Sequence, residues 1–146
     1  MQLIDIIDTG EIQKPIWVAY PDSTTFQVLI RPLGNRHPEF LEKSREVKWD
    51  EPTMEQKVTF NEDTYTRLFG AHVIAGWKGL HVKDLKKLVL LKGFKKLKGL
   101  TGEIACDDTA RDLLLKHSTV FNAWVNRVTR DTERFNRERE EEELKN

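Results

Sequence analysis

The stretch PIWVAYPDSTTFQVLIRPL constrains the fold most, because it carries the clearest strand signal in the chain. Residues 16–20 are rich in β-branched and aromatic side chains, and residues 21–23 supply turn chemistry. Phe26, Val28 and Ile30 then recur at period two, which places them on one face of a return strand. The pattern predicts an antiparallel β-hairpin. Because an isolated hairpin is marginal in water, we expect helices to cover its apolar face.

The residues after the hairpin predict two helices. Pro38 suits the first turn of a helix that runs to about Lys48. Residues 50–60 form a connection for which the sequence predicts no element. Asn61 is a favourable N-cap for a second helix, which we expect to stop near Gly76. The inward residues of the first helix would be Phe40, Leu41, Ser44 and Val47.

Three further helices are predicted towards the C-terminus. A short helix over residues 82–92 would end at Gly93, because glycine commonly follows the last helical turn. Asp107 or Asp108 would cap the next helix, and Ser118 would cap the last one. The fold class is therefore α+β, with an N-terminal antiparallel β-hairpin or small sheet packed on a mostly helical body.

The long final helix has an apolar stripe that stops before the end of the chain. The stripe consists of Phe121, Trp124, Val125, Val128, Thr132 and Phe135. Its continuation would fall on Arg139 and Glu142, so the helix should leave the core near Phe135. We therefore expect a single α+β domain over residues 1–137 and a charged, solvated helix end over residues 138–146. Trp77, Trp124 and Phe135 are expected to be structural anchors.

The same stripe is also a candidate partner-binding surface. An apolar stripe on a helix that outruns a small core commonly supports association. The hypothesis is that this face supports self-association or the binding of a partner protein. Its residues would be Phe121, Val125, Val128 and Phe135.

Composition limits the classes of function. The 24 basic and 24 acidic residues cancel, and the single cysteine, Cys106, excludes an internal disulfide. The N-terminus lacks the features of a secretory signal, and no apolar stretch is long enough to span a bilayer. We expect a cytosolic protein with no membrane partner.

Catalytic and metal-binding patterns are missing from the sequence. The four histidines are scattered, without a second ligand at helical metal-binding spacing, and no HExxH, GxSxG or Walker A motif occurs. The pair Asp107-Asp108 precedes an apolar helical run, where aspartates serve as caps more often than as an acid/base pair. We therefore expect a non-enzymatic protein that binds neither a cofactor nor a metal ion.

The segment from residue 78 to residue 98 is strongly basic, with eight lysines against one acid, Asp84. The functional reading is a small adaptor that binds nucleic acid or a membrane surface through this segment. The alternative is a solvated helix face, which the lack of arginine and exposed aromatic residues favours, so nucleic acid is not a favoured partner. The basic patch would consist of Lys83, Lys86, Lys87, Lys92, Lys95, Lys96 and Lys98.

Four motifs carry a resemblance to a known family: TFQVLIRPL leading into a helix, GWKGL, GEIACDDTARDLLL, and FNAWVNRVTRDTERF followed by a charged tail. Together they resemble the tail assembly chaperones of long-tailed bacteriophages and prophages. The resemblance implies a non-enzymatic protein that holds the aggregation-prone tape-measure protein soluble while tail-tube subunits polymerise around it. The implied partner is the tape-measure protein, with the tail tube protein as a second candidate.

The resemblance also implies a possible second form of the chain. Such chaperones are often made in two lengths, because ribosomes slip backward near the stop codon. Leu144-Lys145-Asn146 can be encoded with a run of A that permits slippage. A longer form is therefore a hypothesis that the gene sequence would test.

Overall fold

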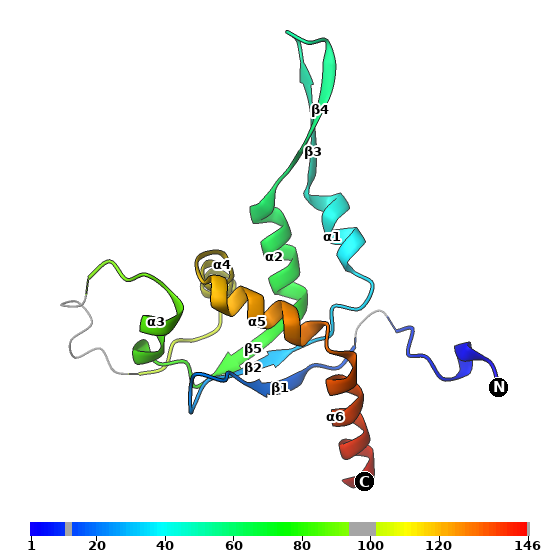
Figure 1. The fold of residues 1–146 in the computed structure, drawn as a ribbon, viewed down its shortest axis with the longest axis vertical. Coiled ribbons are helices and arrows are strands. Elements are labelled where there is room, and N and C mark those ends of the chain that lie inside the picture. The colour runs from blue at the N-terminus through cyan, green and yellow to red at the C-terminus, as the bar shows by residue number, and fades with distance from the viewer. Residues whose placement is uncertain (11–12, 94–101, 146) are drawn as a thin grey trace.

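The computed structural model describes residues 1–10, 13–93 and 102–145, and it shows a mixed α+β fold (Figure 1), as predicted. A three-stranded antiparallel sheet has the order β1-β2-β5. Its strands are β1 (Ile16–Ala19), β2 (Gln27–Ile30) and β5 (Ile74–Lys78). Helices cover one face of this sheet, and a second, two-stranded sheet projects from the far end of the helical layer (Figure 1).

The predicted N-terminal hairpin is confirmed. Val18 lies opposite Val28 in the β1–β2 register, and both side chains are buried on the face that the helices cover. The turn is closed by a hydrogen bond of 2.9 Å from the Tyr20 N–H to the Phe26 carbonyl oxygen. The Ser23 hydroxyl oxygen accepts a further bond, of 3.1 Å, from the Phe26 N–H.

The predicted helix starts are confirmed at three caps. The Asn61 side chain accepts a hydrogen bond from the Thr64 N–H, Asp107 accepts one from Ala110, and Ser118 accepts one from Phe121. Asp107, and not Asp108, is thus the cap of its helix. The helices are η1 (Leu3–Asp5, 3-10), α1 (His37–Ser44), α2 (Glu62–Val73), α3 (Val82–Leu88), α4 (Asp108–His117), α5 (Thr119–Thr129) and α6 (Thr132–Lys145).

The prediction of a helix reaching Lys48 is wrong. The helix α1 ends at Ser44, and the chain continues as β3 (Arg45–Asp50), which pairs with β4 (Glu55–Phe60). Val47 is about half exposed and does not face the core. In this segment apolar and charged residues alternate, so strand pairing separates them onto two faces, which a helix cannot do.

Two other helices end earlier than predicted. The helix α2 ends at Val73, because the residues that follow form β5 and complete the sheet beside β2. Trp77 is consequently a strand residue, and its side chain is buried. The helix α3 ends at Leu88, because Val89 adopts an extended backbone.

The predicted final helix is divided into α5 and α6. The division falls at Arg130–Asp131, where the Asp131 side chain accepts a hydrogen bond of 3.3 Å from the Arg134 N–H. The charged helix end expected over residues 138–146 forms, as far as Lys145, the last turns of α6. Its residues are tied to the N-terminal segment, since Arg139 forms an ion pair of 3.0 Å with Asp8.

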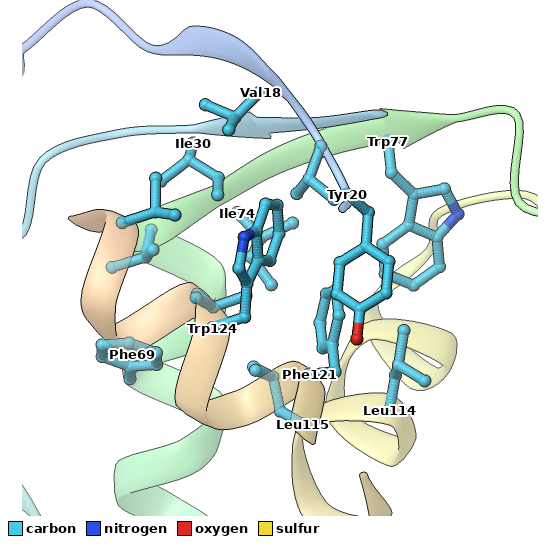
Figure 2. Packing of buried hydrophobic residues seen from close by; sticks show 14 of the residues in the cluster. Val18, Tyr20, Ile30, Phe69, Ile74, Trp77, Leu114, Leu115, Phe121 and Trp124 are labelled. Atoms are coloured by element: carbon cyan, nitrogen blue, oxygen red, sulfur yellow. The ribbon is translucent and has the colours of Figure 1, made fainter. Parts of the chain in front are cut away.

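The core lies between the sheet and the helices, and aromatic rings fill its centre (Figure 2). The Tyr20 ring meets the Trp124 ring edge-on, with centroids 4.9 Å apart, and Phe26 stacks on Phe121 at 5.9 Å. The Trp77 indole N–H donates a 2.9 Å hydrogen bond to the Ile104 carbonyl oxygen. The expected anchors Trp77, Trp124 and Phe135 are all buried.

Candidate functional site

The predicted partner-binding stripe on the last helix lies in the core. Its four residues expose between 0% and 4% of their surface, so they offer no solvent-facing stripe. The expectation assumed that the helix outruns the core. Instead, α5 lies across the sheet (Figure 1), and Phe135, the first apolar residue of α6, is buried. The buried residues of the predicted stripe are Phe121, Val125, Val128 and Phe135.

The described lysines of the predicted basic patch are exposed on α3 and just after it. These are Lys83, Lys86, Lys87 and Lys92. The Lys87 ammonium group donates a 3.2 Å hydrogen bond to the carbonyl oxygen of Asp22, which ties α3 to the turn of the N-terminal hairpin. The remaining predicted members, Lys95, Lys96 and Lys98, lie outside the described residues.

The pKa shifts of His72 and Cys106 are explained by their structural surroundings. Burial lowers the pKa of His72, and the positive charges of Arg36 and Arg31 lower it further. Burial also raises the pKa of the Cys106 thiol, more than the positive charge of Arg111 lowers it, and Asp107 raises it further, so the thiol is not activated. Within the part of the chain that the structure describes, no group of three or more His, Cys, Asp and Glu side chains could hold a metal ion.

Among the residues that the structure describes, no helix combines the length and the apolar character needed to cross a bilayer.

An open apolar groove of about 320 Å³ lies between α3 and α4. Leu113 on α4 is 53% exposed at this groove, and Leu90, just after α3, is fully exposed. A groove whose walls are aliphatic and still in contact with water is suited to covering the apolar stripe of another helix. Its walls include Leu85, Val89, Leu90, Ala110, Leu113 and Leu114, and its floor includes Trp77 and Leu80.

A second cavity, of about 490 Å³, lies between the N-terminal segment and α6. Two of its charged side chains pair with each other, since Asp8 contacts Arg139 at 3.0 Å. The backbone N–H of Gly10 and the Arg139 guanidinium group together lower the pKa of Asp8. The charges of this cavity therefore hold the N-terminal segment against α6.

The β3–β4 hairpin, which we call the arm (residues 45–60), is the second apolar surface. It extends beyond α1 and α2 (Figure 1). Val47, Trp49, Val58 and Phe60 are between 46% and 58% exposed. The sequence analysis missed this surface. The alternation in EVKWD and KVTF around the turn-forming residue Pro52 was the available signal.

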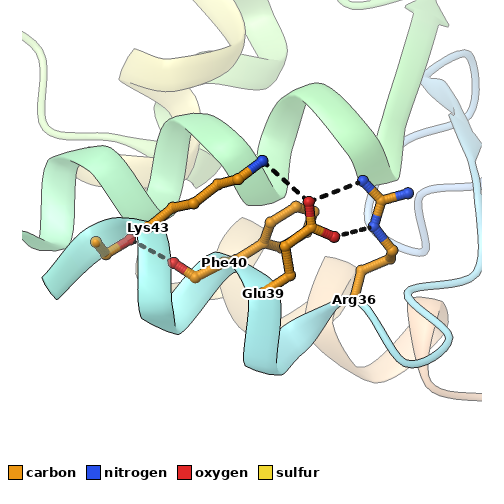
Figure 3. A network of polar contacts seen from close by, with 5 residues as sticks. Arg36, Glu39, Phe40 and Lys43 are labelled. Atoms are coloured by element: carbon orange, nitrogen blue, oxygen red, sulfur yellow. Dashed lines mark hydrogen bonds and ion pairs between the residues drawn. The ribbon is translucent and has the colours of Figure 1, made fainter.

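The arm follows directly after α1, and polar contacts run along that helix. Figure 3 shows the Glu39 carboxylate between Arg36, at 2.7 Å, and Lys43, at 2.9 Å. At the end of the same helix, the buried Ser44 hydroxyl donates a 2.7 Å hydrogen bond to the Phe40 carbonyl oxygen. The Arg36–Glu39 pair lies in the first turn of α1, whereas the Ser44 hydrogen bond lies in the last turn, from which β3 leaves.

No protein-family model, no curated protein and no solved structure matches this chain. The resemblance to tail assembly chaperones therefore rests on the sequence motifs alone. The groove and the arm are the candidate binding surfaces of the described residues.

Proposed function

We propose that this protein is a non-enzymatic tail assembly chaperone that binds the tape-measure protein of a long-tailed phage or prophage. The resemblance of the sequence motifs supplies the identity of the client. The observation that supports binding of a client helix is the open apolar groove between α3 and α4. The tail tube protein is a further candidate partner, and the site of action would be the host cytosol.

The groove suits a helical client. A long helical protein without its tube exposes apolar stripes, which aggregate unless another apolar surface covers them. If a helix of the client lies in the groove between α3 and α4, its apolar residues, spaced three and four apart, become buried. This kind of binding requires no catalytic group. Leu90 and Leu113 are exposed at the groove in the free protein, so they are available for this contact.

The proposal is tested by co-expressing the full chain with the tape-measure protein encoded in the same phage or prophage genome. We expect the chaperone to keep that protein soluble and to co-purify with it. Leu113→Glu places a carboxylate in the groove and should reduce co-purification by about tenfold or more, because a buried unpaired charge costs more than one factor of ten in affinity.

A matched control is available on α5. Val120 is 54% exposed, almost the same as Leu113 at 53%, but it lies outside the groove. Val120→Glu should leave co-purification unchanged. Equal binding by both variants, or a client that stays insoluble with the wild-type chain, would contradict the proposal. Retention of the wild-type chain on heparin, lost at moderate salt, would instead favour the adaptor that acts through residues 78–98.

A further inference from the structure

The second half of α6 meets the rest of the molecule through charged side chains. The apolar stripe of the last two helices ends at Phe135, which is buried, and its continuation falls on Arg139 and Glu142. Every described residue of α6 after Phe135 is exposed except Arg139, which is partly buried. Leu144, the last apolar residue, is 80% exposed. Burial of apolar side chains therefore contributes little to the position of α6 beyond Phe135.

Two ion pairs join this part of α6 to the N-terminal segment. The Arg139 guanidinium group lies 3.0 Å from the Asp8 carboxylate, and the Lys14 ammonium group pairs with the Glu142 carboxylate. Arg139 and Glu142 are three residues apart, so they lie on the same face of the helix. All four side chains, which we call the clasp, are between 35% and 65% exposed, so dissolved salt can screen both pairs.

The charges of the clasp are arranged in opposite order on its two sides. The N-terminal segment supplies an acid and then a base, Asp8 and Lys14. The helix α6 supplies the reverse, Arg139 and then Glu142. Exchanging the two contacts would bring like charges together, so the charges specify one arrangement of the two segments. Lys14 lowers the pKa of Glu142, and the Gly10 N–H and Arg139 lower the pKa of Asp8, so both acids are charged at neutral pH.

The clasp lies at the cavity of about 490 Å³ between the N-terminal segment and α6. Leu33 and Phe135 are buried apolar residues in the wall of this cavity. Ile6 and Ile7 line it from the N-terminal segment, but more than half of their surface is exposed. The apolar contact across the cavity is therefore incomplete, and the ion pairs are the main link between the two segments.

We propose that the clasp is a salt-sensitive device that holds the N-terminal segment and the second half of α6 together and releases both at once. An exposed ion pair typically shifts an equilibrium by about 1.4- to 5-fold, so two pairs favour the closed state by about 2- to 30-fold. Salt removes this preference, because the Debye length falls from about 30 Å at 0.01 M to about 3 Å at 1 M. Release moves Ile6 and Ile7 away from the cavity, which exposes Leu33 and Phe135 to solvent.

The distance between the two segments measures the state of the clasp. Spin labels on Thr9→Cys and Glu143→Cys, both at exposed positions, report this distance in a chain whose single cysteine is removed by Cys106→Ala. The populations at short and long distance give the ratio of closed to open molecules. We expect mainly the short distance at about 0.01 M salt, and a ratio at least about fivefold lower at about 1 M.

A matched pair of substitutions tests the role of the Asp8–Arg139 contact. Asp8→Asn removes the charge that faces Arg139 and keeps an oxygen for the Gly10 N–H. Asp5→Asn removes the same charge three residues earlier, where the carboxylate accepts a hydrogen bond from the Gln2 N–H and does not contact α6. At about 0.01 M salt, Asp8→Asn should lower the closed-to-open ratio by about two- to fivefold, and Asp5→Asn should leave it unchanged.

A charge reversal tests the second contact. Glu142→Lys opposes Lys14 and should lower the closed-to-open ratio by about two- to fivefold. A positive charge near the C-terminal end of a helix stabilises the helix, so this loss would not be caused by melting of α6. Circular dichroism checks that the helical content is kept. Combining Glu142→Lys with Lys14→Glu restores opposite charges and should restore the wild-type ratio.

Each outcome supports or overturns the proposal. A distance that does not change with salt would overturn it, and so would equal effects of Asp8→Asn and Asp5→Asn. A double reversal that stays open would show that the Lys14–Glu142 pair does not hold the clasp. The Leu113→Glu groove variant should keep the wild-type ratio, so failure of this proposal is distinguishable from failure of the proposed client binding.

Discussion

The backbone N–H of Asn61 donates a 2.8 Å hydrogen bond to the carbonyl oxygen of Ser44, and this bond joins the two ends of the arm. The Asn61 side chain acts on both sides of the same point. Its Oδ1 atom accepts a 3.0 Å bond from the Thr64 N–H at the start of α2, and its Nδ2 atom donates a 2.9 Å bond to Glu46 on β3. One residue thus caps a helix and closes a hairpin.

Replacing Asn61 by alanine should therefore destabilise the protein. Loss of a helix N-cap typically costs about 1 kcal/mol, within a range of about 0.5–2 kcal/mol. The free energy of unfolding from urea titration measures this cost. Asn136→Ala on the exposed side of α6 is the control, and it should change the free energy by less than about 0.5 kcal/mol. An equal effect of the two substitutions would contradict the capping role.

Two tryptophans should differ sharply on truncation to alanine. Trp124 is 5% exposed and contacts the Tyr20 ring in the core, whereas Trp49 is 58% exposed on the arm. Trp124→Ala should cost about 3–5 kcal/mol of the free energy of unfolding, because it removes a buried aromatic side chain. Trp49→Ala should cost less than about 1 kcal/mol, because more than half of the Trp49 surface is already in contact with water in the folded protein. Similar losses would place Trp49 against the core.

The motif GWKGL contains two glycines with different roles. Gly79 has a φ angle of +72°, and a Cβ atom there would lie 1.9 Å from the Thr25 carbonyl oxygen. The Thr25 hydroxyl also donates a 2.8 Å hydrogen bond to the Gly79 carbonyl oxygen, which holds the two backbones together. Gly79→Ala should therefore cost about 2 kcal/mol or more, because it combines an unfavourable φ with a backbone clash.

Gly76 provides the matched control for Gly79. No atom lies within 4 Å of the position that its Cβ atom would take. Gly76→Ala should be neutral or stabilising, because glycine inside a strand loses more conformational entropy than alanine on folding. Melting temperatures of the two variants measure the difference. A destabilised Gly76→Ala variant would show that space at β5 is more restricted than this structure indicates.

His72 should make stability depend on pH. Burial, Arg36 and Arg31 lower the pKa of His72 below its ordinary value of 6.5, so the unfolded chain binds this proton more readily than the folded one. The contribution of neutral His72 is therefore fully present above pH 6.5, and it is lost as the pH falls from 6.5 towards the lower pKa of the folded state. Acidification from about pH 7.5 to about pH 5.5 should lower the free energy of unfolding.

Substitution of His72 identifies its share of this loss. The variant His72→Gln should lose less stability than the wild type over the same pH interval. Urea titrations at the two pH values give the comparison. Identical pH dependence in wild type and His72→Gln would contradict the assignment.

Local rules were sufficient for the elements whose causes lie within a few residues. The caps at Asn61, Asp107 and Ser118 were predictable, because an N-cap bonds an N–H only three residues away. The β1–β2 hairpin was predictable because a short turn joins two strands with a clear period of two. The apolar stripe of α5 was also correct as a list of residues that share one face.

Tertiary structure decided what those local patterns could not. The segment after Val73 became β5 because β2, more than forty residues earlier in the chain, offered an open edge. Residues 45–50, by contrast, pair locally with residues 55–60, and their alternating pattern was a signal that the helix prediction missed. The segment after Val73 was ambiguous in sequence, since the strand that it pairs with lies far away in the chain.

The sequence by itself therefore determined the N-terminal hairpin, the helix starts and which residues share a face. Only the tertiary structure decided what each apolar face meets. Phe121 and Val125 meet the sheet and are buried, whereas Val47 and Val58 keep about half of their surface in water. Hydrophobic periodicity records which side chains lie together on a face, but burial depends on the layer that covers that face, and the position of that layer is set by contacts between distant parts of the chain.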